Sequence, residues 1–410
     1  MFFWGAGTSA HQVEGGMQND WTEWEKANAG KLAERARTHP PAGEWPDYLL
    51  ALDPPPLLPE NYISGTGADH YHRFKEDFDI AKSLGHNAHR FSLEWSRIEP
   101  EEGIFDEKEI EHYRQVILTL KERGLEPFVT VWHYTLPLWL SRKGGVLNPK
   151  FAEYFTRFTE RAVREYKNDV RFWATINEPE VYAITRYFFD QRPFFHKLLF
   201  AYWKILRRLI TAHRMAYTAA KKTAPSAQIG IVCALSHVDS KGGFINNMVK
   251  AVIDKVWNHF FLRRVSRCID FIGLNHYFHT IVNYGIQRNT RGKLSDMNWE
   301  LYPEGLYHVL KSLKRYQKPV YITEHGLADA RDAHRAWYIQ EGLTHVGRAR
   351  KEGVDVRGYF HWSLIDIFEW AEGFWPHFGL VAVDYKTLKR TVRPSALAYK
   401  KIIEEHPEGP

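Results

Sequence analysis

Eight short hydrophobic runs recur along the chain, and each predicts a buried β-strand. They cover residues 2–9, 87–95, 126–133, 172–178, 228–235, 268–277, 318–326 and 356–364. Most are nearly continuous in apolar residues and lack the alternation of a sheet with one solvent-exposed face. The pattern therefore favours parallel strands that are covered on both faces.

Helical periodicity fills the segments between these runs. One apolar helix face comprises Tyr71, Phe74, Phe78, Ala81 and Leu84, and a second comprises Ile110, Tyr113, Ile117 and Leu120. The second helix is predicted to begin with a capping box at Asp106 and Glu109 and to stop at Gly124. Eight strands alternating with helices predict a single α/β domain over residues 1–410. This domain is a (β/α)8 TIM barrel with its active site at the C-terminal ends of the strands.

Residues 38–67 depart from this alternation, because seven prolines exclude a long helix there. The segment is predicted to be a loop insertion after the first strand. Two interpretations remain open, a surface insertion and a wall of the pocket mouth.

Composition narrows the class of protein. A hydrophobic content of 44% excludes a disordered chain, and no run approaches the ~20 apolar residues of a membrane span. The net charge of +6 is spread along the length, which argues against nucleic-acid binding. Aromatic residues make up 15%, more than an ordinary core needs, and such a surplus often lines ligand sites.

The cysteines and histidines argue against a disulfide framework and against a metal site. Cys233 and Cys268 are too few for a disulfide framework, do not have metal-ligand spacing and are expected to be buried thiols on neighbouring strands. The first residues show no basic leader or cleavage site, so the expected location is cytoplasmic. The 21 histidines include no helical metal-binding pair, and we expect neither a metal nor a cofactor.

Polar residues gather where the predicted strands end. Glu178 ends the fourth strand and Glu324 the seventh, so the two carboxylates are expected to face each other across the barrel mouth. Paired carboxylates flanking a cleft are what glycoside hydrolysis requires. Indoles for a sugar face and hydrogen-bond partners for its hydroxyls are also predicted there, namely Trp132, Trp362, Trp370, Gln12, His133, Asn177 and Glu369.

These residues resemble glycoside hydrolase family 1, the retaining β-glycosidases. Asn177-Glu178-Pro179 is similar to the family's acid/base motif, and Ile322-Thr323-Glu324-His325-Gly326 to its nucleophile motif. Further similar segments, in the same order, are Phe3-Trp4-Gly5-Ala6, residues 90–97, 144–149 and 368–370, and Phe378-Gly379-Leu380.

The resemblance implies a role for each matching residue. Glu178 would be the acid/base and Glu324 the nucleophile, and Asn177 would bind the sugar 2-hydroxyl. Gln12, His133 and Glu369 match sugar-binding positions, Trp370 matches an indole that contacts the sugar, and Trp362 matches the platform beneath it. Arg90 and Tyr277, with Asn275 beside Tyr277, are assigned to holding the nucleophile ionised and oriented. The charge of Glu324 should favour the protonated form of Glu178.

The sequence also departs from the family's usual pattern. His325 stands where Asn is usual, His276 where Tyr is common, Tyr134 where Trp is common, and Ile367 where Asn usually precedes Phe-Glu-Trp. Tyr134 adjoins a sugar-binding position, so it is a candidate for altered specificity.

An aromatic and basic stretch follows the fourth strand. Residues 194–222 predict an outer barrel helix with a basic side. The aromatic residues within 187–208 suggest either a contact with a membrane surface or second subunit, or an apolar site for the leaving group.

The leading hypothesis from the sequence is a retaining exo-β-glycosidase. Its partner would be a small β-glucoside, β-galactoside or related glycoside, with an apolar aglycone as one option. The alternatives are a sugar-binding barrel without turnover and a protein that mainly transfers sugars to alcohols.

Overall fold

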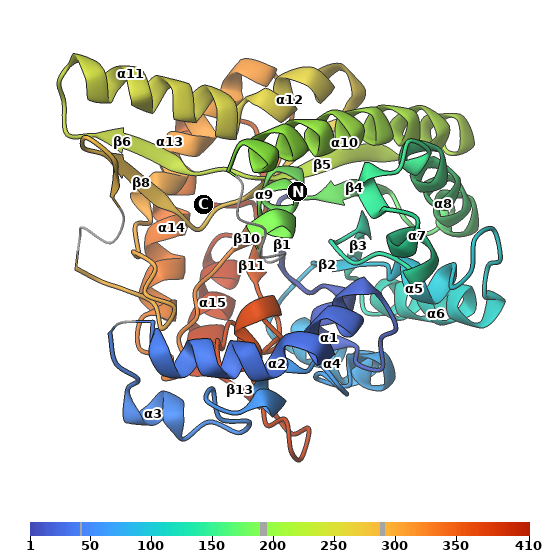
Figure 1. The fold of residues 1–410 in the computed structure, drawn as a ribbon, viewed down its shortest axis with the longest axis horizontal. Helices are drawn as coiled ribbons and strands as arrows, with labels where there is room; N and C mark the ends of the chain where they lie inside the picture. The colour runs from blue at the N-terminus through green and yellow to red at the C-terminus, as the bar shows by residue number, and fades with distance from the viewer. Residues whose placement is uncertain (42, 189–194, 288–291) are drawn as a thin grey trace.

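The eight predicted strands close into one parallel barrel in the computed structural model, which describes residues 1–41, 43–188, 195–287 and 292–410 (Figure 1). Around the barrel the order is β1-β11-β10-β7-β5-β4-β3-β2. The strands are β1 (Phe3–Gly7), β2 (Ala88–Ser92), β3 (Glu126–Trp132), β4 (Phe172–Asn177), β5 (Gln228–Ala234), β7 (Phe271–Asn275), β10 (Val320–His325) and β11 (Val356–Trp362). The predicted TIM barrel is confirmed. All eight strands lie within the predicted runs, and each ends before the predicted run does.

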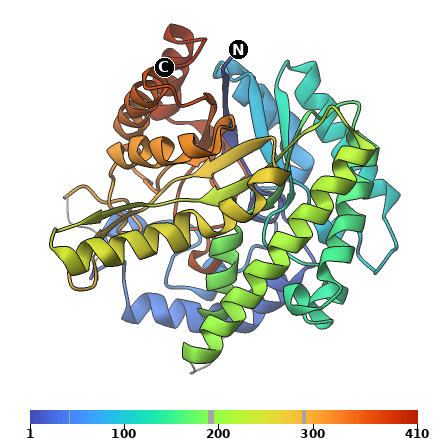
Figure 2. The ribbon, with the colours of Figure 1, turned by 90° about the horizontal axis from the view of Figure 1, so that it is seen from above.

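Helices surround the barrel on its outside (Figures 1 and 2). The longer ones are α2 (Asp20–Thr38), α4 (His70–Ser83), α6 (Glu107–Glu122), α8 (Phe151–Tyr166), α9 (Pro179–Phe188), α10 (Phe195–Thr223), α11 (Phe244–Ile253), α13 (Glu304–Leu313), α14 (Arg335–Lys351) and α15 (Pro394–Glu405). The shorter α-helices are α1 (Ala10–Val13), α3 (Asp47–Leu50), α5 (Trp95–Ile98), α7 (Leu138–Arg142) and α12 (Phe260–Val265). Short turns of other helix types are η1 (Pro59–Tyr62), η2 (Gly145–Leu147), η3 (Asp254–Asn258), η4 (Ser266–Cys268), η5 (Lys314–Tyr316) and η6 (Trp370–Glu372). Among the described residues, no helix is long and apolar enough to cross a membrane.

The two predicted helix faces are buried. Phe74, Phe78 and Ala81 of α4 belong to the main hydrophobic core, as do Ile110, Tyr113, Ile117 and Leu120 of α6. Asp106 caps α6 by accepting hydrogen bonds from the amides of Lys108 at 2.8 Å and Glu109 at 3.4 Å. Gly124 follows the helix with φ 68°, a left-handed conformation that glycine adopts without steric cost. The hydrophobic period and the helix-end residues therefore specified both helices.

Aromatic rings fill the interior of the barrel. Phe128 and Phe172 stack with ring centroids 4.3 Å apart, and Phe271, Tyr321 and Phe360 complete the cluster. Gly230 makes room for it, because a Cβ there would lie 2.4 Å from the Phe271 ring. Part of the aromatic surplus thus serves packing and not ligand binding.

After the end of α2 at Thr38, the described residues of the proline-rich segment 38–67 form the short helices α3 and η1, and the segment supports α2. Tyr62, Trp45 and Leu57 pack with Leu32 and Ala33 of α2 in a separate hydrophobic cluster. α2 in turn carries Trp21 and Trp24, which line the main cavity. The segment thus packs behind an element of the cavity wall.

Two small sheets lie outside the barrel. β6 (His237–Ser240), β8 (His279–Val282) and β9 (Ile286–Gln287) form one, and β12 (Val381–Val383) with β13 (Arg390–Val392) the other. Cys233 is buried in β5 as expected. The expectation for Cys268 is wrong, because β7 begins only at Phe271 and Cys268 is half-buried at the end of η4.

Candidate active site

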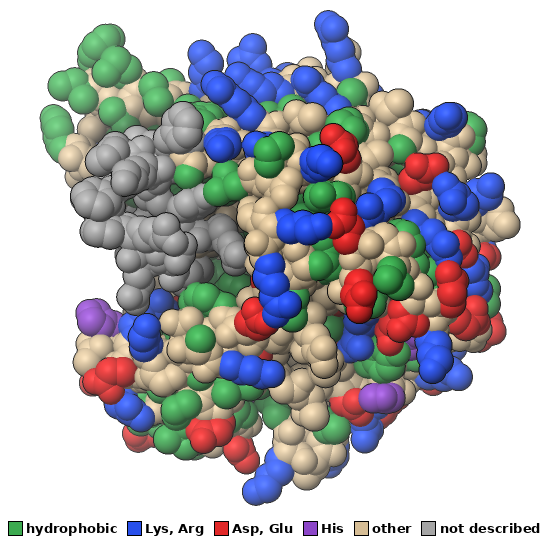
Figure 3. Space-filling view, turned by 45° about the vertical axis from the view of Figure 1, so that its right-hand side comes forward, with side chains coloured by type: hydrophobic (Ala, Val, Ile, Leu, Met, Phe, Trp, Pro, Cys, Tyr) green, Lys and Arg blue, Asp and Glu red, His purple; other side chains and the backbone are tan. Residues whose placement is uncertain are grey.

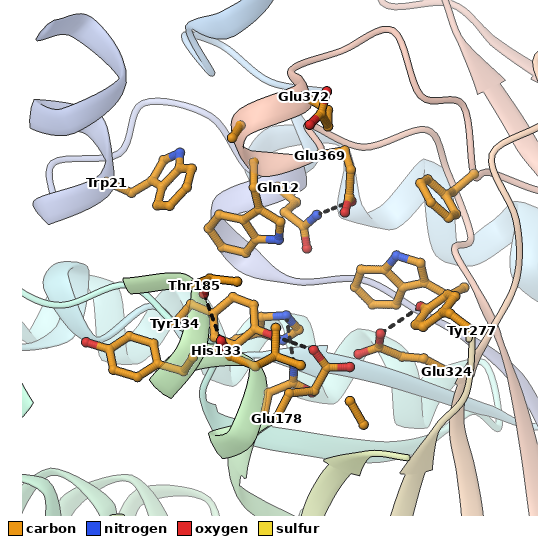
Figure 4. A pocket seen from close by; sticks show the side chains of 18 of the residues that line it. Gln12, Trp21, His133, Tyr134, Glu178, Thr185, Tyr277, Glu324, Glu369 and Glu372 are labelled. Atoms are coloured by element: carbon orange, nitrogen blue, oxygen red, sulfur yellow. Dashed lines mark hydrogen bonds between the residues drawn. The ribbon is translucent and has the colours of Figure 1, made fainter. Parts of the chain in front are cut away.

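A cavity of 430 Å³ opens at the C-terminal ends of the barrel strands (Figure 4). Nine of the twelve side chains singled out from the sequence line it, namely Gln12, His133, Asn177, Glu178, Tyr277, Glu324, Trp362, Glu369 and Trp370. Arg90 and Asn275 are buried and hydrogen-bond to lining residues. Trp132 does not line the cavity as expected: it is buried behind Tyr182, and its Nε1 donates to the carbonyl oxygen of Thr135. Residues far apart in the chain meet because parallel barrel strands end at one rim.

Glu324 lies in β10 between a cation and a phenol. Arg90 Nη1 donates to Glu324 Oε1 at 2.5 Å, and the Tyr277 hydroxyl donates to Glu324 Oε2 at 2.8 Å. Both Arg90 and Glu324 are buried. Two donors, one of them charged, contact both carboxyl oxygens and fix the orientation of the group.

Arg90 also ties Glu324 to neighbouring strands. Its Nη2 donates to Asn177 Oδ1 at 2.6 Å, its Nε to Thr130 Oγ1 at 3.2 Å and its Nη1 to the carbonyl oxygen of Thr323 at 3.3 Å. The rigid guanidinium fork therefore joins β2, β3, β4 and β10 at the floor of the cavity.

Glu178 follows β4 directly and is held by neutral groups. Asn275 Nδ2 donates to Glu178 Oε1 at 2.7 Å, and the Tyr134 hydroxyl donates to Glu178 Oε2. Burial raises the pKa of Glu178 to about 7, and the negative charge of Glu324 contributes to the rise. The two carboxyl groups thus have different surroundings: a cation contacts Glu324, and neutral donors contact Glu178.

Asn275 lies beside Glu178, whereas the sequence assigned it to the support of Glu324. Its backbone is in register with Glu324 on one side and with Ala234 on the other. The Asn275 amide reaches across β5, which lies between β7 and β4 in the barrel, to Glu178. The Thr323 hydroxyl donates to Asn275 Oδ1 at 2.7 Å and so directs the amide NH₂ toward the carboxylate.

Three cavity residues adopt the left-handed backbone conformation that non-glycine residues rarely use. Their φ angles are 76° for Tyr134, 45° for Glu178 and 51° for Trp370. Such conformations persist where the surrounding structure enforces them, and they cluster at functional sites. The three conformations therefore support the assignment of this cavity as the functional site.

Gln12 and Glu369 form a polar end of the cavity. Gln12 Nε2 donates to Glu369 Oε2 at 3.1 Å, and the Ser9 hydroxyl donates to Gln12 Oε1 at 2.7 Å. Burial, followed by the charges of Glu324 and Glu178, raises the pKa of Glu369 to about 8. Near pH 7 this carboxyl can therefore both donate and accept hydrogen bonds.

His133 and Asn177 lie between the polar end and the two carboxyl groups. Their side-chain atoms His133 Nε2 and Asn177 Nδ2 are 3.2 Å apart. Burial lowers the pKa of His133 well below its usual range, so the imidazole is neutral. The His133 ring lies nearly parallel to the Trp362 indole, with centroids 5.9 Å apart.

The sequence did not identify most of the apolar residues that line the cavity, nor the hydrogen bond from Tyr134 to Glu178. The cavity is also lined by Trp21 and Trp24 from α2, by Val181, Tyr182 and Thr185 from α9, and by Phe278, Trp299 and Phe378. The unusual number of aromatic residues was the available signal, but it did not say which rings reach the cavity. The bond from Tyr134 to Glu178 was also missed, although Tyr134 had been noted as a departure.

Among the residues that the structure describes, no group of three or more His, Cys, Asp or Glu side chains could hold a metal ion.

Comparison with known proteins gives one consistent result. The family model described as Glycosyl hydrolase family 1 matches residues 55–265 and 236–408. Beta-glucosidase A of Thermotoga maritima is 30% identical over 99% of this chain and 97% of its own length. A beta-galactosidase of Sulfolobus acidocaldarius is 32% identical over 84% of this chain and 85% of its own length. The solved structure of the Thermotoga maritima beta-glucosidase in complex with glucoimidazole superimposes with a TM-score of 0.85 at 29% identity, covering 98% of this chain and 97% of that one.

Proposed function

The chain belongs to glycosyl hydrolase family 1, and on this premise we propose that it is a retaining exo-β-glycosidase acting on small β-glucosides and β-galactosides. Glycoside hydrolysis follows from the family membership. The retaining mechanism and the residue roles are proposals that rest on the cavity.

The observation that carries the proposal is the pair Glu178 and Glu324 in one cavity with opposite surroundings. The ion pair with Arg90 favours a carboxylate at Glu324, which suits a nucleophile. The pKa of about 7 leaves much of Glu178 protonated near neutral pH, which suits a general acid.

In the proposed first step Glu324 attacks the anomeric carbon. The bond from that carbon to the leaving oxygen breaks while Glu178 gives its proton to this oxygen, and a glycosyl ester of Glu324 forms. In the second step Glu178 takes a proton from water. The resulting oxygen attacks the anomeric carbon, releases Glu324 and gives the free sugar.

The sugar itself is proposed to bind between the two carboxyl groups and the polar end. Gln12, His133, Asn177 and Glu369 would hold its hydroxyls, and Trp362 and Trp370 would contact its apolar ring face. The hydrogen bond between Gln12 and Glu369 uses one amide hydrogen and one carboxyl oxygen. Both side chains can therefore make further hydrogen bonds to a ligand.

The stereochemistry of the first-formed sugar tests the proposal. With an aryl β-glucoside and an aryl β-galactoside as substrates, we expect proton NMR to detect the β-anomer first, before mutarotation. Appearance of the α-anomer first would contradict a retaining mechanism. Glu324→Gln is the control for background hydrolysis.

We predict that Tyr134→Phe moves the alkaline limb of the kcat/KM–pH profile to higher pH by about one unit. The Tyr134 hydroxyl donates to Glu178 and so stabilises its carboxylate. Its removal should raise the pKa of Glu178 above about 7, and the protonated acid would persist to higher pH. Tyr166→Phe is the control, because that hydroxyl donates to the Ile110 carbonyl oxygen outside the cavity. A profile that shifts downward or not at all would contradict the assigned contact.

We also predict that kcat/KM rises with chain length in a series of alkyl β-glucosides. Val181 and Thr185 lie four residues apart on one face of α9, and with Trp21 and Trp24 they form a half-exposed wall on the side of Glu178. Each added methylene could contribute up to ~0.8 kcal/mol, or about fourfold. Val181→Ser should flatten the series, and a flat series in the unaltered protein would contradict an apolar aglycone site.

The sequence had suggested another source for this site. Phe188 and Phe189 belong to the aromatic stretch within 187–208, and the side chains of residues 186–200 lie outside the described residues. Their contribution to the aglycone site remains a prediction.

A further inference from the structure

Exposed apolar side chains concentrate on α11 and the β8–β9 hairpin. Half of the twelve large hydrophobic residues that are exposed in the described part of the chain lie there. Their exposed fractions are 83% for Phe244, 58% for Ile245, 53% for Met248, 56% for Val252, 88% for Tyr284 and 63% for Ile286. A contiguous apolar surface of this kind indicates an interaction site.

Most of the large apolar side chains of α11 face outward. Phe244, Ile245, Met248 and Val252 are exposed, Val249 and Ile253 are half-buried, and the one fully buried residue is the polar Asn246. Asn246 Nδ2 donates to the carbonyl oxygen of Gly242 at 2.9 Å, and Asn246 Oδ1 accepts from the amide of Tyr284 at 2.9 Å. The same side chain therefore joins the helix to the hairpin and keeps both apolar segments on one surface.

Positive charge is concentrated next to this surface. Residues 195–268 contain 13 Lys and Arg against two Asp and no Glu, a local charge of 13 − 2 = +11 in a chain of net charge +6. The exposed members include Lys241 and Lys255 near α11 and Arg263, Arg264 and Arg267 at α12 and η4. Helices α11, α12 and α10 follow one another along the upper edge of Figure 1, and Figure 3 shows Lys and Arg side chains along that edge beside a hydrophobic group.

Repulsion within this group shows that its charges are close together. Arg264 has its pKa lowered by burial and by the charges of Arg263, Arg207 and Arg214. Arg264 also lies over the Phe260 ring, 3.4 Å from its centroid. Uncompensated cations beside exposed aromatic and aliphatic groups are typical of proteins that bind the surface of an anionic bilayer.

We propose that α11 and the β8–β9 hairpin dock on an anionic lipid bilayer, with the apolar side chains entering the interface and the basic residues of α10–α12 facing the headgroups. A second copy of the chain fits less well, because the exposed Lys and Arg side chains beside this surface would meet like charges in a symmetric contact. The proposal concerns a surface outside the catalytic cavity and does not depend on the proposed function.

Co-sedimentation with vesicles tests this proposal. We expect the full chain to bind vesicles that contain phosphatidylglycerol and phosphatidylcholine at low salt, and to bind pure phosphatidylcholine much less. Binding should fall steeply at about 0.5 M salt, where charges more than a few Å apart are screened. Absence of binding to the anionic vesicles at low salt, or equal binding to both vesicle types, would overturn the proposal.

Matched variants locate the surface. Phe244→Ser with Met248→Ser should lower the partition coefficient at least tenfold, and Arg263→Gln and Arg267→Gln should lower it about fivefold each. Ile104→Ser with Leu397→Ser is the control, because these residues are 58% and 59% exposed elsewhere on the molecule. Circular dichroism melting curves check that each variant is folded. Unchanged vesicle binding by the α11 variant would overturn the proposal, as would a dimer in sedimentation velocity that this variant abolishes.

Discussion

Glu324→Ala is expected to lower kcat/KM by roughly 10⁴- to 10⁶-fold, because it removes the proposed nucleophile. Added azide should restore part of the turnover by occupying the space of the lost carboxylate. Azide would then attack from the face opposite the leaving group, so the product should be an α-glycosyl azide. Product analysis by NMR and a rate measurement with an aryl β-glucoside check both expectations.

Glu324→Gln is the matched control for that experiment. It keeps the volume of the side chain and a partner for Tyr277, so it should be inactive but poorly rescued by azide. Circular dichroism should show both variants folded, since Arg90 retains its bonds to Asn177, Thr130 and Thr323. Near-normal turnover of either variant without azide would remove Glu324 from the nucleophile role.

Glu178→Ala is expected to slow glycosides with poor leaving groups by roughly 10²- to 10⁴-fold, which is the usual contribution of a general acid. Substrates with strongly acidic leaving groups, such as dinitrophenyl glycosides, need little protonation and should form the glycosyl-enzyme nearly as fast as before. Steady-state kinetics across a series of aryl glycosides measures the difference. The alkaline limb of the pH profile should also disappear with the loss of the group whose pKa is about 7.

Azide separates this variant from the previous one. In Glu178→Ala the sugar is already bound to Glu324 when azide enters from the vacated leaving-group side, so the product should be a β-glycosyl azide. Equal losses on good and poor leaving groups, or an α-azide product, would show that Glu178 is not the acid/base. The two variants together test both proposed roles, because the expected azide product is the α-anomer for Glu324→Ala and the β-anomer for Glu178→Ala.

Three of the carboxyl groups that line the cavity, those of Glu178, Glu324 and Glu369, differ in their contact with a cation. Arg90 makes its ion pair with Glu324, while Glu178 and Glu369 have no cation of their own among their described hydrogen-bond partners. Burial and mutual repulsion raise the pKa values of Glu178 and Glu369 to about 7 and about 8. The Arg90 guanidinium therefore makes its ion pair with one of the three carboxyl groups and leaves the other two without a cation as a described hydrogen-bond partner.

The barrel could be predicted from the sequence because its signals are local. Continuous apolar runs mark strands buried on both faces, and the stripes of α4 and α6 mark helices with one buried face. The ends of the strands were less accurate. Cys268 was assigned to a strand although β7 begins at Phe271, because hydrophobicity continues past the point where hydrogen bonding to the neighbouring strand stops.

The candidate site was predicted in part for a similar reason. Strand-end residues such as Glu178 and Glu324 could be recognised, since parallel strands in a barrel all end at one rim. Trp21 and Trp24 could not, because α2 is not adjacent in sequence to the end of a strand and reaches the cavity only by packing. The contact of Asn275 with Glu178 crosses a neighbouring strand, and Tyr134 contacts Glu178 from a left-handed backbone conformation, and neither follows from a motif.

The sequence by itself determined the family, the barrel and the two carboxyl groups, because each of these is encoded in residue types at short range or in ordered motifs. Only the tertiary structure decided the surroundings of each carboxyl group. Those depend on burial and on the distance to Arg90, which joins four strands that are far apart in the chain. The tertiary structure likewise decided that Phe244 and Met248 of α11 are exposed, because the side of the helix that carries Asn246 is the buried one, and a partner of Asn246 is the amide of Tyr284, 38 residues away. A hydrophobic pattern shows that a helix has two faces, but it does not show which face has a protein partner.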